Sequence, residues 1–179
     1  KYTLLGGNMN NRHEVHLESE RLLLRNMKLT DSEFFINLWT NQDVTEFMGG
    51  PRDKGKMLDA VKEVLDDPYL EEYDLWILTE KESNQPIGHC GLLSKSVEGR
   101  DEVEVIYVID KPHWGKGYAS EICKMLISYA FEDKKLNRVI ALINPKNKGS
   151  ESVALKNGMM LEKEVLREEK KMLLYVKEQ

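Results

Sequence analysis

The sequence predicts a single α/β domain whose central sheet contains both parallel and antiparallel strands. Residues 75–78 and 87–93 are short apolar runs on either side of a Pro-containing turn, a pattern typical of an antiparallel hairpin. Farther along, the strand-like segments 103–109 and 139–143 flank an amphipathic helix at 118–131. Because a strand–helix–strand unit normally joins two parallel strands, the sheet is predicted to be mixed.

The N-terminal third is predicted to hold one strand and two helices. An apolar strand is expected over 17–25, and Thr30-Asp31 followed by Ser32-Glu33 predicts the start of a helix. Gly49-Gly50-Pro51 breaks the chain before a second helix, expected over 53–65. Residues 1–16 lack the apolar core of a signal peptide. They are predicted to be a flexible lead-in or an expression remnant, so that 17–179 form the domain.

The second half is predicted from its periodicity. Residues 103–109 are rich in Val, Ile and Tyr, as strands are, and 118–131 carry apolar side chains at i, i+3 and i+4. After the strand at 139–143, a short helix is expected over 150–157, with Gly158 as its C-cap. The tail favours two further strands, 161–167 and 172–176, although the same apolar residues could serve a charged helix. The charged run 162–171 is interpreted as a solvated face.

Length and charge exclude several classes of protein. The 179 residues suit one domain, which at this size needs no disulfide or metal for stability. The net charge is -5 and no basic stripe appears, so no nucleic-acid partner is expected. No apolar run reaches the roughly 18 residues of a membrane span. Cys90 and Cys123 lie far apart and the four His show no zinc spacing, which favours a cytoplasmic protein without a metal.

The loop Gly115-Lys116-Gly117 stands between the clearest strand and the clearest helix. Glycines let backbone N–H groups approach an anion, and a helix N-terminus adds orphan donors and a positive dipole end. Together with Lys116, these features suit a phosphate or diphosphate, although a plain turn has the same pattern. A Walker A loop would need a hydroxyl residue after Lys116. A Rossmann fingerprint would need Gly at Ser120 and an acid at Asn144.

Two segments of the sequence resemble the motifs of a known protein family. The stretch 107–121, YVIDKPHWGKGYASE, resembles the signature loop of the GNAT acetyltransferase superfamily, Gln/Arg-x-x-Gly-x-Gly/Ala, with Pro112 in place of the usual Gln or Arg. The second segment, 147–159, is similar to the Asn-x-x-Ser/Ala…Lys-x-Gly-Phe run of that family, with Met159 in place of Phe. The opening segment 17–25 also resembles the branch that contains ribosomal-protein N-terminal acetyltransferases.

The resemblance implies a mostly antiparallel sheet, flanked by helices, whose central parallel strands splay apart to admit CoA. It implies that the pantetheine arm bonds the backbone near Ile106 and Val108. The diphosphate would sit on amides of the signature loop. The implied CoA-binding residues are Ile106, Val108, Trp114, Gly115, Lys116, Gly117, Tyr118, Ala119, Asn147, Ser150 and Lys156.

Transfer of an acetyl group to an amine requires the amine to lose a proton. Glu104 matches an acidic position in related enzymes and is the base candidate, with Glu102, of the same side parity, as the alternate. Many relatives place a Tyr where Ala154 stands here. The departing thiolate must therefore be protonated by Ser150, by Tyr107, by water or by the ammonium itself.

The acceptor is expected to be a peptide N-terminal α-amine, because such an amine is neutral far more often at pH 7 than a lysine amine. The alternatives are a small amine such as a polyamine, an aminoglycoside or an amino acid. A CoA-binding sensory domain without turnover and a dinucleotide-binding module also stay open. A homodimer is possible, as in related enzymes.

Several other residues suggest chemistry but have plainer explanations. His89 and Cys90 are adjacent on a predicted strand and so point to opposite faces, and Cys123 lies on the apolar face of its helix. His113 could contact CoA, although a solvated loop position is the plainer interpretation. The aromatic and Met side chains of the region that forms the acceptor pocket in the family, which could also be plain core, are Phe34, Trp39, Phe47 and Met48.

Overall fold

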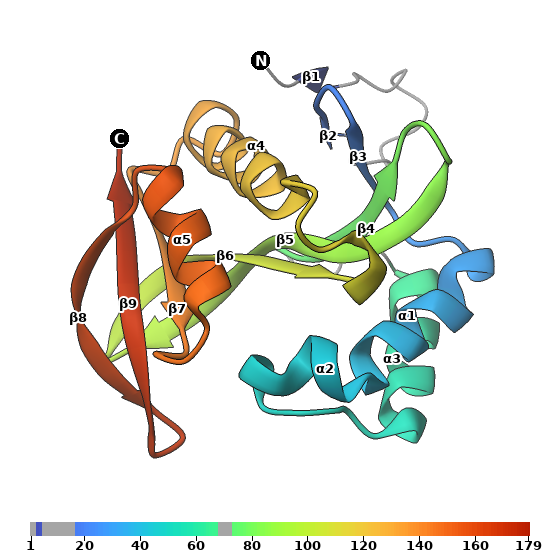
Figure 1. Cartoon of the computed structure of the whole chain (residues 1–179), viewed down its shortest axis with the longest axis horizontal. Coiled ribbons are helices and arrows are strands. Elements are labelled where there is room, and N and C mark those ends of the chain that lie inside the picture. The colour runs from blue at the N-terminus through green and yellow to red at the C-terminus, as the bar shows by residue number, and fades with distance from the viewer. Residues whose placement is uncertain (1–2, 5–16, 68–72) are drawn as a thin grey trace.

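A computed structural model of the chain describes residues 3–4, 17–67 and 73–179 (Figure 1). The described strands form one sheet of nine strands in the order β1-β2-β3-β4-β5-β6-β7-β9-β8. They are β1 (Thr3–Leu4), β2 (Leu17–Glu18), β3 (Leu22–Arg25), β4 (Leu75–Glu80), β5 (Gln85–Val97), β6 (Arg100–Ile109), β7 (Arg138–Ile143), β8 (Met160–Arg167) and β9 (Lys170–Glu178). Each neighbouring pair is antiparallel except β6 and β7, which confirms the predicted mixed sheet.

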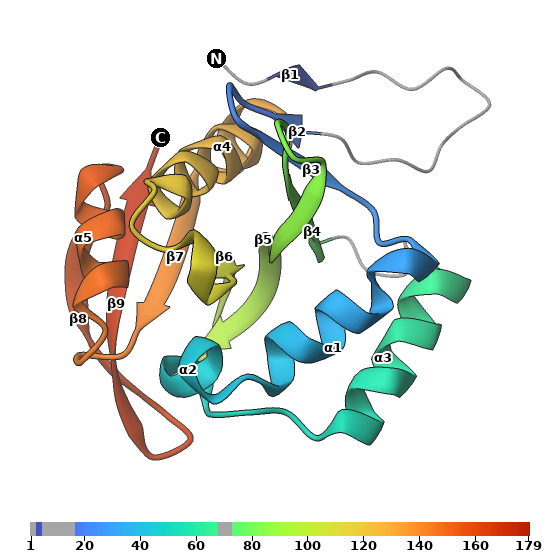
Figure 2. The same ribbon diagram turned by 45° about the vertical axis from the view of Figure 1, so that its right-hand side comes forward.

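Helices cover both faces of the sheet (Figures 1 and 2). Their bounds are α1 (Ser32–Thr40), α2 (Gln42–Thr45), α3 (Lys54–Asp66), α4 (Tyr118–Glu132) and α5 (Lys148–Lys156), with 3₁₀ turns η1 (Leu29–Asp31), η2 (Glu46–Met48) and η3 (Lys111–His113). α4 and α5 share the larger core with one face, and α1 and α3 pack against the other. β6 separates the two cores, because Val105 and Ile109 face the larger one and Val108 faces the smaller one.

The prediction of one strand over 17–25 was wrong, because the segment folds back on itself. β2 and β3 pair antiparallel and are joined by a tight turn. The backbone N–H of Ser19 donates to the carbonyl of Leu22 over 2.9 Å, and the Ser19 hydroxyl accepts from the Leu22 N–H over 3.2 Å. The polar triplet Ser19-Glu20-Arg21 thus interrupts the apolar pattern, while Leu17, Leu22 and Leu24 on the two strands are fully buried.

The two predicted N-terminal helices are confirmed. α1 buries Phe35, Leu38 and Trp39, whose helical spacing predicts it, and also Ile36. α3 begins after Asp53, whose side chain accepts a hydrogen bond from the Lys56 N–H over 3.0 Å and so acts as the N-cap. The break before it needs glycine, because Gly49 and Gly50 both have positive φ.

The parallel strands β6 and β7 lie next to each other in the sheet but pair over only a short stretch. β5 and β6 pair over their last ten residues as a long hairpin, so β6 is fully bonded on that side. On its other side, β6 meets β7 in parallel register at one position, Glu104 opposite Ile140. On its other edge, β7 pairs antiparallel with β9 along its whole length. Beyond Glu104 the two central strands diverge, which is the splay that the family resemblance implies.

The tail forms the predicted pair of strands, β8 and β9, with an irregularity in their register between Leu161 and Lys163. β8 is the edge strand and mostly exposed, which agrees with a solvated charged run. Val165 alone among its side chains is buried, against the third apolar cluster. Most of residues 1–16, the predicted lead-in, lies outside the described residues, and the single domain 17–179 stays a prediction.

Candidate functional site

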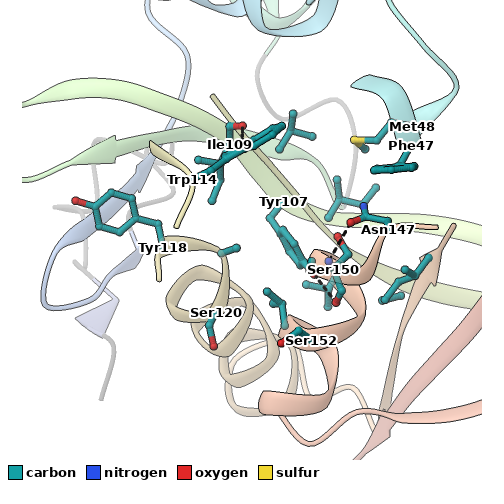
Figure 3. Close-up of a pocket in the computed structure, with 18 of the residues that line it drawn as sticks. Phe47, Met48, Tyr107, Ile109, Trp114, Tyr118, Ser120, Asn147, Ser150 and Ser152 are labelled. Atoms are coloured by element: carbon teal, nitrogen blue, oxygen red, sulfur yellow. Dashed lines mark hydrogen bonds between the residues drawn. The ribbon is translucent and has the colours of Figure 1, made fainter. Parts of the chain in front are cut away.

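A cleft of about 570 Å³ opens where β6 and β7 diverge (Figure 3). Its walls come from both central strands, the η3–α4 loop, α5 and the α2–η2 segment. Of the residues predicted to bind CoA, those that line it are Ile106, Val108, Trp114, Gly115, Gly117, Tyr118, Ala119, Asn147, Ser150 and Lys156. Lys116, which was also predicted, does not line the cleft.

The N-terminus of α4 faces this cleft with its backbone amides open. α4 follows Gly117, and no side chain caps it. Among the described residues, the amides of 115–120 donate to no backbone carbonyl, and the helix ladder starts with Glu121 N–H bonding the Gly117 carbonyl over 3.2 Å. A Cβ built at Gly115 would meet nothing within 4 Å. We call the backbone N–H groups of residues 115–119 the amide cradle; it fits an anion, and side chains do not fill it.

The amide cradle needs glycine at two positions. Gly115 and Gly117 have φ of 75° and 82°, in the left-handed region that residues with a Cβ avoid. The indole Nε1 of Trp114 donates to the carbonyl of Ile109 over 2.7 Å, which attaches the loop to the end of β6. The backbone N–H of Trp114, which was expected to bind the diphosphate as well, instead donates to the Lys111 carbonyl over 3.1 Å and closes η3. These contacts explain why this sequence leaves the helix N-terminus accessible.

The start of α5 forms the opposite side of the cleft. The side chain of Asn147 accepts from the Ser150 N–H over 3.0 Å and so caps this helix. The hydroxyl of Tyr107 lies 3.5 Å from the Ser150 carbonyl, to which it donates (Figure 3). Burial raises the pKa of Tyr107 well above its usual value, so its hydroxyl stays protonated and can donate at neutral pH. Ala154, which stands where many relatives have a Tyr, is fully buried and is not among the residues that line the cleft.

Glu104 lies at the inner end of the splay and lines the cleft. It is 5% exposed, and its Oε1 accepts from the Leu142 N–H over 3.3 Å. Its Oε2 has no hydrogen-bond partner in the described structure, with Lys95 Nζ 3.8 Å away. Burial raises the pKa of Glu104, and the charges of Lys95 and Arg167 and the Leu142 amide offset this only in part.

Glu102, the alternate base, lies outside this cleft. Its carboxylate accepts from Nε of Arg138 over 3.1 Å and lies 3.3 Å from Nε of Arg100. Arg138 in turn donates to Glu162 over 2.9 Å, so the group joins β6, β7 and β8. Although Glu102 and Glu104 share a strand face, the geometry places only Glu104 beside the splay.

The α2–η2 segment lines the cleft with apolar side chains and one acid. Figure 3 shows Phe47 and Met48 together above Asn147. Val44 and Asp43 complete this wall, and Asp43 pairs with Lys111 of η3 over 2.6 Å. No sequence pattern predicted that Asp43 and Val44 line the site, because nothing in their short helical segment indicates that it lies opposite a strand from the middle of the chain.

The other two candidates for the acceptor pocket are not part of the cleft. Trp39 is buried and donates its indole N–H to His89 Nδ1 over 3.2 Å. Phe34 packs at the margin of the smaller core. Three residues inside the two family-like segments line the cleft although they were not predicted as site residues: Ser120, Ser152 and Val153.

Of the remaining reactive side chains, His89 and the two cysteines belong to the core, whereas His113 does not. Cys90 and Cys123 are buried, and burial raises the pKa of each thiol to about 12. His89 faces the smaller core and Cys90 the larger, which confirms that they point apart. His113 lines the cleft, and its Nδ1 is buried without a partner among the described residues.

In the part of the chain that the structure describes, His, Cys, Asp and Glu side chains form no group of three that could hold a metal ion. None of the helices in 17–67 and 73–179 is long and apolar enough to cross a bilayer.

Comparison with known proteins identifies the family. The model of the acetyltransferase (GNAT) domain matches residues 21–160, which is most of the chain. The chain belongs to the GNAT acetyltransferase family. An uncharacterized N-acetyltransferase of Bacillus licheniformis, p20, is 33% identical over 153 residues, which are 84% of each chain. The GNAT chain described here is therefore an N-acetyltransferase, as the signature loop indicates.

Solved structures show the same fold. A Vibrio cholerae spermidine N-acetyltransferase, solved with CoA and spermine, has a TM-score of 0.74 at 16% identity, covering 90% of this GNAT chain and 97% of its own. The ribosomal-protein-S5-alanine acetyltransferase of Vibrio fischeri has a TM-score of 0.68 at 20% identity, with 92% and 96% covered. Ribosomal-protein acetyltransferases are thus among the structural neighbours, and the predicted GNAT fold is confirmed.

Proposed function

We propose that this protein transfers the acetyl group of acetyl-CoA to the α-amine at the N-terminus of a peptide or protein. The observation that carries the proposal is the open amide cradle, at one end of a cleft that reaches the buried carboxylate of Glu104. An anion site and a base at opposite ends of one cleft suit a long anionic acyl donor and an amine acceptor.

The residues present fit CoA along the length of the cleft. The diphosphate binds the amide cradle, where orphan N–H donors and the α4 dipole favour negative charge. Lys156, at the C-terminal end of α5, reaches a phosphate from the other wall. The pantetheine arm lies along the free side of β6 at Ile106 and Val108, beyond the position where β7 still pairs. Asn147 and Ser150 line the pantetheine on the α5 side.

Acetyl-CoA supplies the thioester carbonyl, and the chain supplies the proton transfers around it. Glu104 accepts a proton from the acceptor amine, directly or through water, so that the nitrogen lone pair can form the C–N bond as the C–S bond breaks. The raised pKa of Glu104 makes this carboxylate a stronger base than an exposed one. Ser150 donates a proton to the departing sulfur. The Tyr107 hydroxyl helps to hold Ser150 in place, because it donates a hydrogen bond to the Ser150 carbonyl.

The choice of an α-amine follows from the cost of deprotonation. An amine with a pKa of about 10.4, as in lysine, is neutral about once in 2,500 at pH 7, against about one in seven for an α-amine near 7.8. Deprotonation at pH 7 therefore costs roughly 4.6 kcal/mol for the lysine amine and roughly 1.2 kcal/mol for the α-amine. A general base is typically worth about 100- to 10,000-fold, which covers the second cost with margin.

The acceptor side of the cleft supports an amine next to an apolar group. Phe47, Met48 and Val44 offer apolar contact, and Asp43 places a carboxylate at the same wall. Asp43 and Lys111 are both more than half exposed, so their ion pair is weak and an incoming cation can compete for Asp43. A peptide whose first residue is apolar fits this wall.

A thiol-release assay with acetyl-CoA tests the proposal. The panel contains peptides with a free N-terminus, the same peptides with a blocked N-terminus and an internal lysine, spermidine, an aminoglycoside and free amino acids. We expect kcat/KM to be highest for free N-termini and to fall at least tenfold on blocking. Higher turnover of spermidine or the aminoglycoside would assign a small-amine acceptor, and CoA binding without turnover of any amine would indicate a sensory domain.

A further inference from the structure

The turn between β2 and β3, which interrupts the predicted N-terminal strand, packs against the first turn of α4. The two segments are about a hundred residues apart in sequence, and Figure 2 shows β2 and β3 beside α4. The turn is itself anchored, because Lys81 Nζ donates to the Ser19 carbonyl over 2.8 Å and the Lys81 N–H donates to the Arg21 carbonyl over 2.9 Å. It therefore forms a fixed support outside the cleft.

Glu121 of α4 is the centre of the contact. Its Oε1 accepts from the Ser19 hydroxyl over 2.7 Å and from the Arg21 N–H over 3.1 Å. Its Oε2 accepts from Arg21 Nε over 2.8 Å and lies 2.7 Å from Arg21 Nη2. Burial favours a higher pKa for Glu121, but these donors outweigh it and the pKa lies below its usual value. We call Ser19, Arg21 and Glu121 the clasp.

Arg21 also holds the backbone of the amide cradle. Its Nη1 donates to the carbonyl of Lys116 over 2.9 Å, and its guanidinium lies 4.6 Å from the centre of the Tyr118 ring. A Cβ built at Gly117 would come within 3.5 Å of Arg21 Nη2, so the guanidinium packs on the outer side of this glycine. Neither Arg21 nor Lys116 lines the cleft, whereas Gly117 does.

Peptide geometry links this outer contact to the inner one. The Lys116 carbonyl and the Gly117 N–H belong to one peptide unit, and in a trans peptide they point in opposite directions. When Arg21 fixes the carbonyl on the outside, the Gly117 N–H is directed away from Arg21, toward the cleft. The two glycines on either side of Lys116 give this loop much conformational freedom, so a fixed peptide plane lowers the entropy lost on binding an anion.

We propose that Arg21 is a positioning residue for CoA: held by Glu121, it fixes the peptide plane between Lys116 and Gly117 so that the amide cradle is preformed for the diphosphate. The inference rests on the proposed CoA site and adds residues that the signature loop does not contain. It also gives a reason for the polar triplet at 19–21 within an apolar segment.

The negative charge of Glu121 makes the expected effect of Glu121→Gln on CoA affinity opposite to what charge alone predicts. A carboxylate in the first turn of α4 opposes a diphosphate at that helix end, so charge alone predicts that Glu121→Gln binds CoA more tightly. If the clasp positions the loop, Glu121→Gln should instead bind CoA more weakly, because the neutral amide of this variant would not hold the guanidinium against the Lys116 carbonyl. Arg21→Gln removes the same contact from the other side.

The test compares two acetyl donors in the full chain. Isothermal titration measures the Kd for CoA, and steady-state kinetics measure kcat and KM for acetyl-CoA and for S-acetyl-pantetheine, which lacks the diphosphate. For Arg21→Gln and for Glu121→Gln we expect the CoA Kd and the acetyl-CoA KM to rise about tenfold, since a hydrogen bond from a charged group is lost. kcat and the S-acetyl-pantetheine kcat/KM should stay within about twofold of wild type, and the double variant should resemble each single variant.

Lys62→Gln is the matched control, because it removes one cation from an exposed ion pair on α3, and its CoA Kd should equal that of wild type. A Glu121→Gln variant that binds CoA as tightly as wild type, or more tightly, would overturn the proposal. An equal loss with both acetyl donors would also overturn it, because it would mean that the clasp only supports folding. A wild-type protein that does not bind CoA would refute the proposed function itself.

Discussion

At the scale of single residues, the contrast between Glu102 and Glu104 shows how the environment assigns roles. Both are buried acids on one face of β6. Glu102 meets Arg138 and Arg100, so its charge is compensated and fixed. Glu104 keeps one oxygen without a hydrogen-bond partner among the described residues, and burial raises its pKa. A carboxylate that lines a cleft in this state has the properties of a general base.

Glu104→Gln is expected to lower kcat/KM at least tenfold at neutral pH, because the amide cannot accept the amine proton. The loss should shrink as the pH rises, since a growing share of the acceptor is then already neutral. The measurement is a pH–rate profile for both proteins from pH 6 to pH 9. Glu102→Gln should lower thermal stability rather than kcat, and wild-type rates from Glu104→Gln would exclude the proposed role.

His89 makes stability depend on pH. The Trp39 indole donates to its Nδ1, so Nε2 carries the proton and donates to the Leu75 carbonyl over 3.1 Å. Burial lowers the pKa of His89 from 6.5 to about 4. The folded state thus favours neutral imidazole, and this stability is complete above pH 6.5 and lost as the pH falls toward 4. The loss amounts to about 3 kcal/mol.

Urea denaturation at pH 7.5 and at pH 4.5 measures this effect. The free energy of unfolding of wild type should fall more between the two pH values than that of His89→Gln, which has no imidazole to protonate. Parallel losses in the two proteins would show that other groups cause the acid sensitivity.

At the scale of elements, the η3–α4 loop has a functional property, its open amides, that could be predicted from a short stretch of sequence. Its open amides follow from two positive-φ glycines and an uncapped helix start, both of which are properties of a few consecutive residues. β2 and β3 show the opposite case. Their apolar residues were recognised in the sequence, but the turn at 19–21 depends on side-chain contacts with α4 and with Lys81 that no local pattern contains.

Gly115→Ala is expected to weaken CoA binding about tenfold or more, because a Cβ there enters the amide cradle. Gly99→Ala is the control, since Gly99 has φ of 80° in the β5–β6 turn and a Cβ added at either glycine would meet open space. Each variant should lose about 1 kcal/mol of stability from left-handed strain. Calorimetry should find weaker CoA binding in Gly115→Ala alone, and equal affinities in the two would contradict an anion site at this loop.

At the scale of the whole molecule, the splay of β6 and β7 is the feature on which the cleft depends. The two strands pair at one position and then separate, and the gap is lined from both faces of the sheet. A ligand in it contacts α4, α5 and both central strands at once. Binding should therefore stabilise the native state as a whole.

CoA at about 100 times its Kd should stabilise the protein by about 2.7 kcal/mol. For a chain of this size, that corresponds to a rise in Tm of roughly 5–10 °C. Thermal denaturation with and without CoA measures the shift, and hydrogen exchange should show new protection at 104–108 and 115–120. An adenine dinucleotide that protects as well as CoA would favour the alternative of a dinucleotide-binding module.

The order and type of most elements, and the loop typical of the family, could be predicted from local patterns. These features depend on periodicity within one element, on Gly115 and Gly117, and on short spacings such as Asn147 to Gly158. The folded arrangement alone shows that Glu104 rather than Glu102 lies beside the splay and that the α2–η2 segment faces the splay. Only it brought Arg21 to the amide cradle. The physical reason is that burial, charge compensation and the direction of a peptide plane depend on residues far apart in the chain, which local patterns do not record.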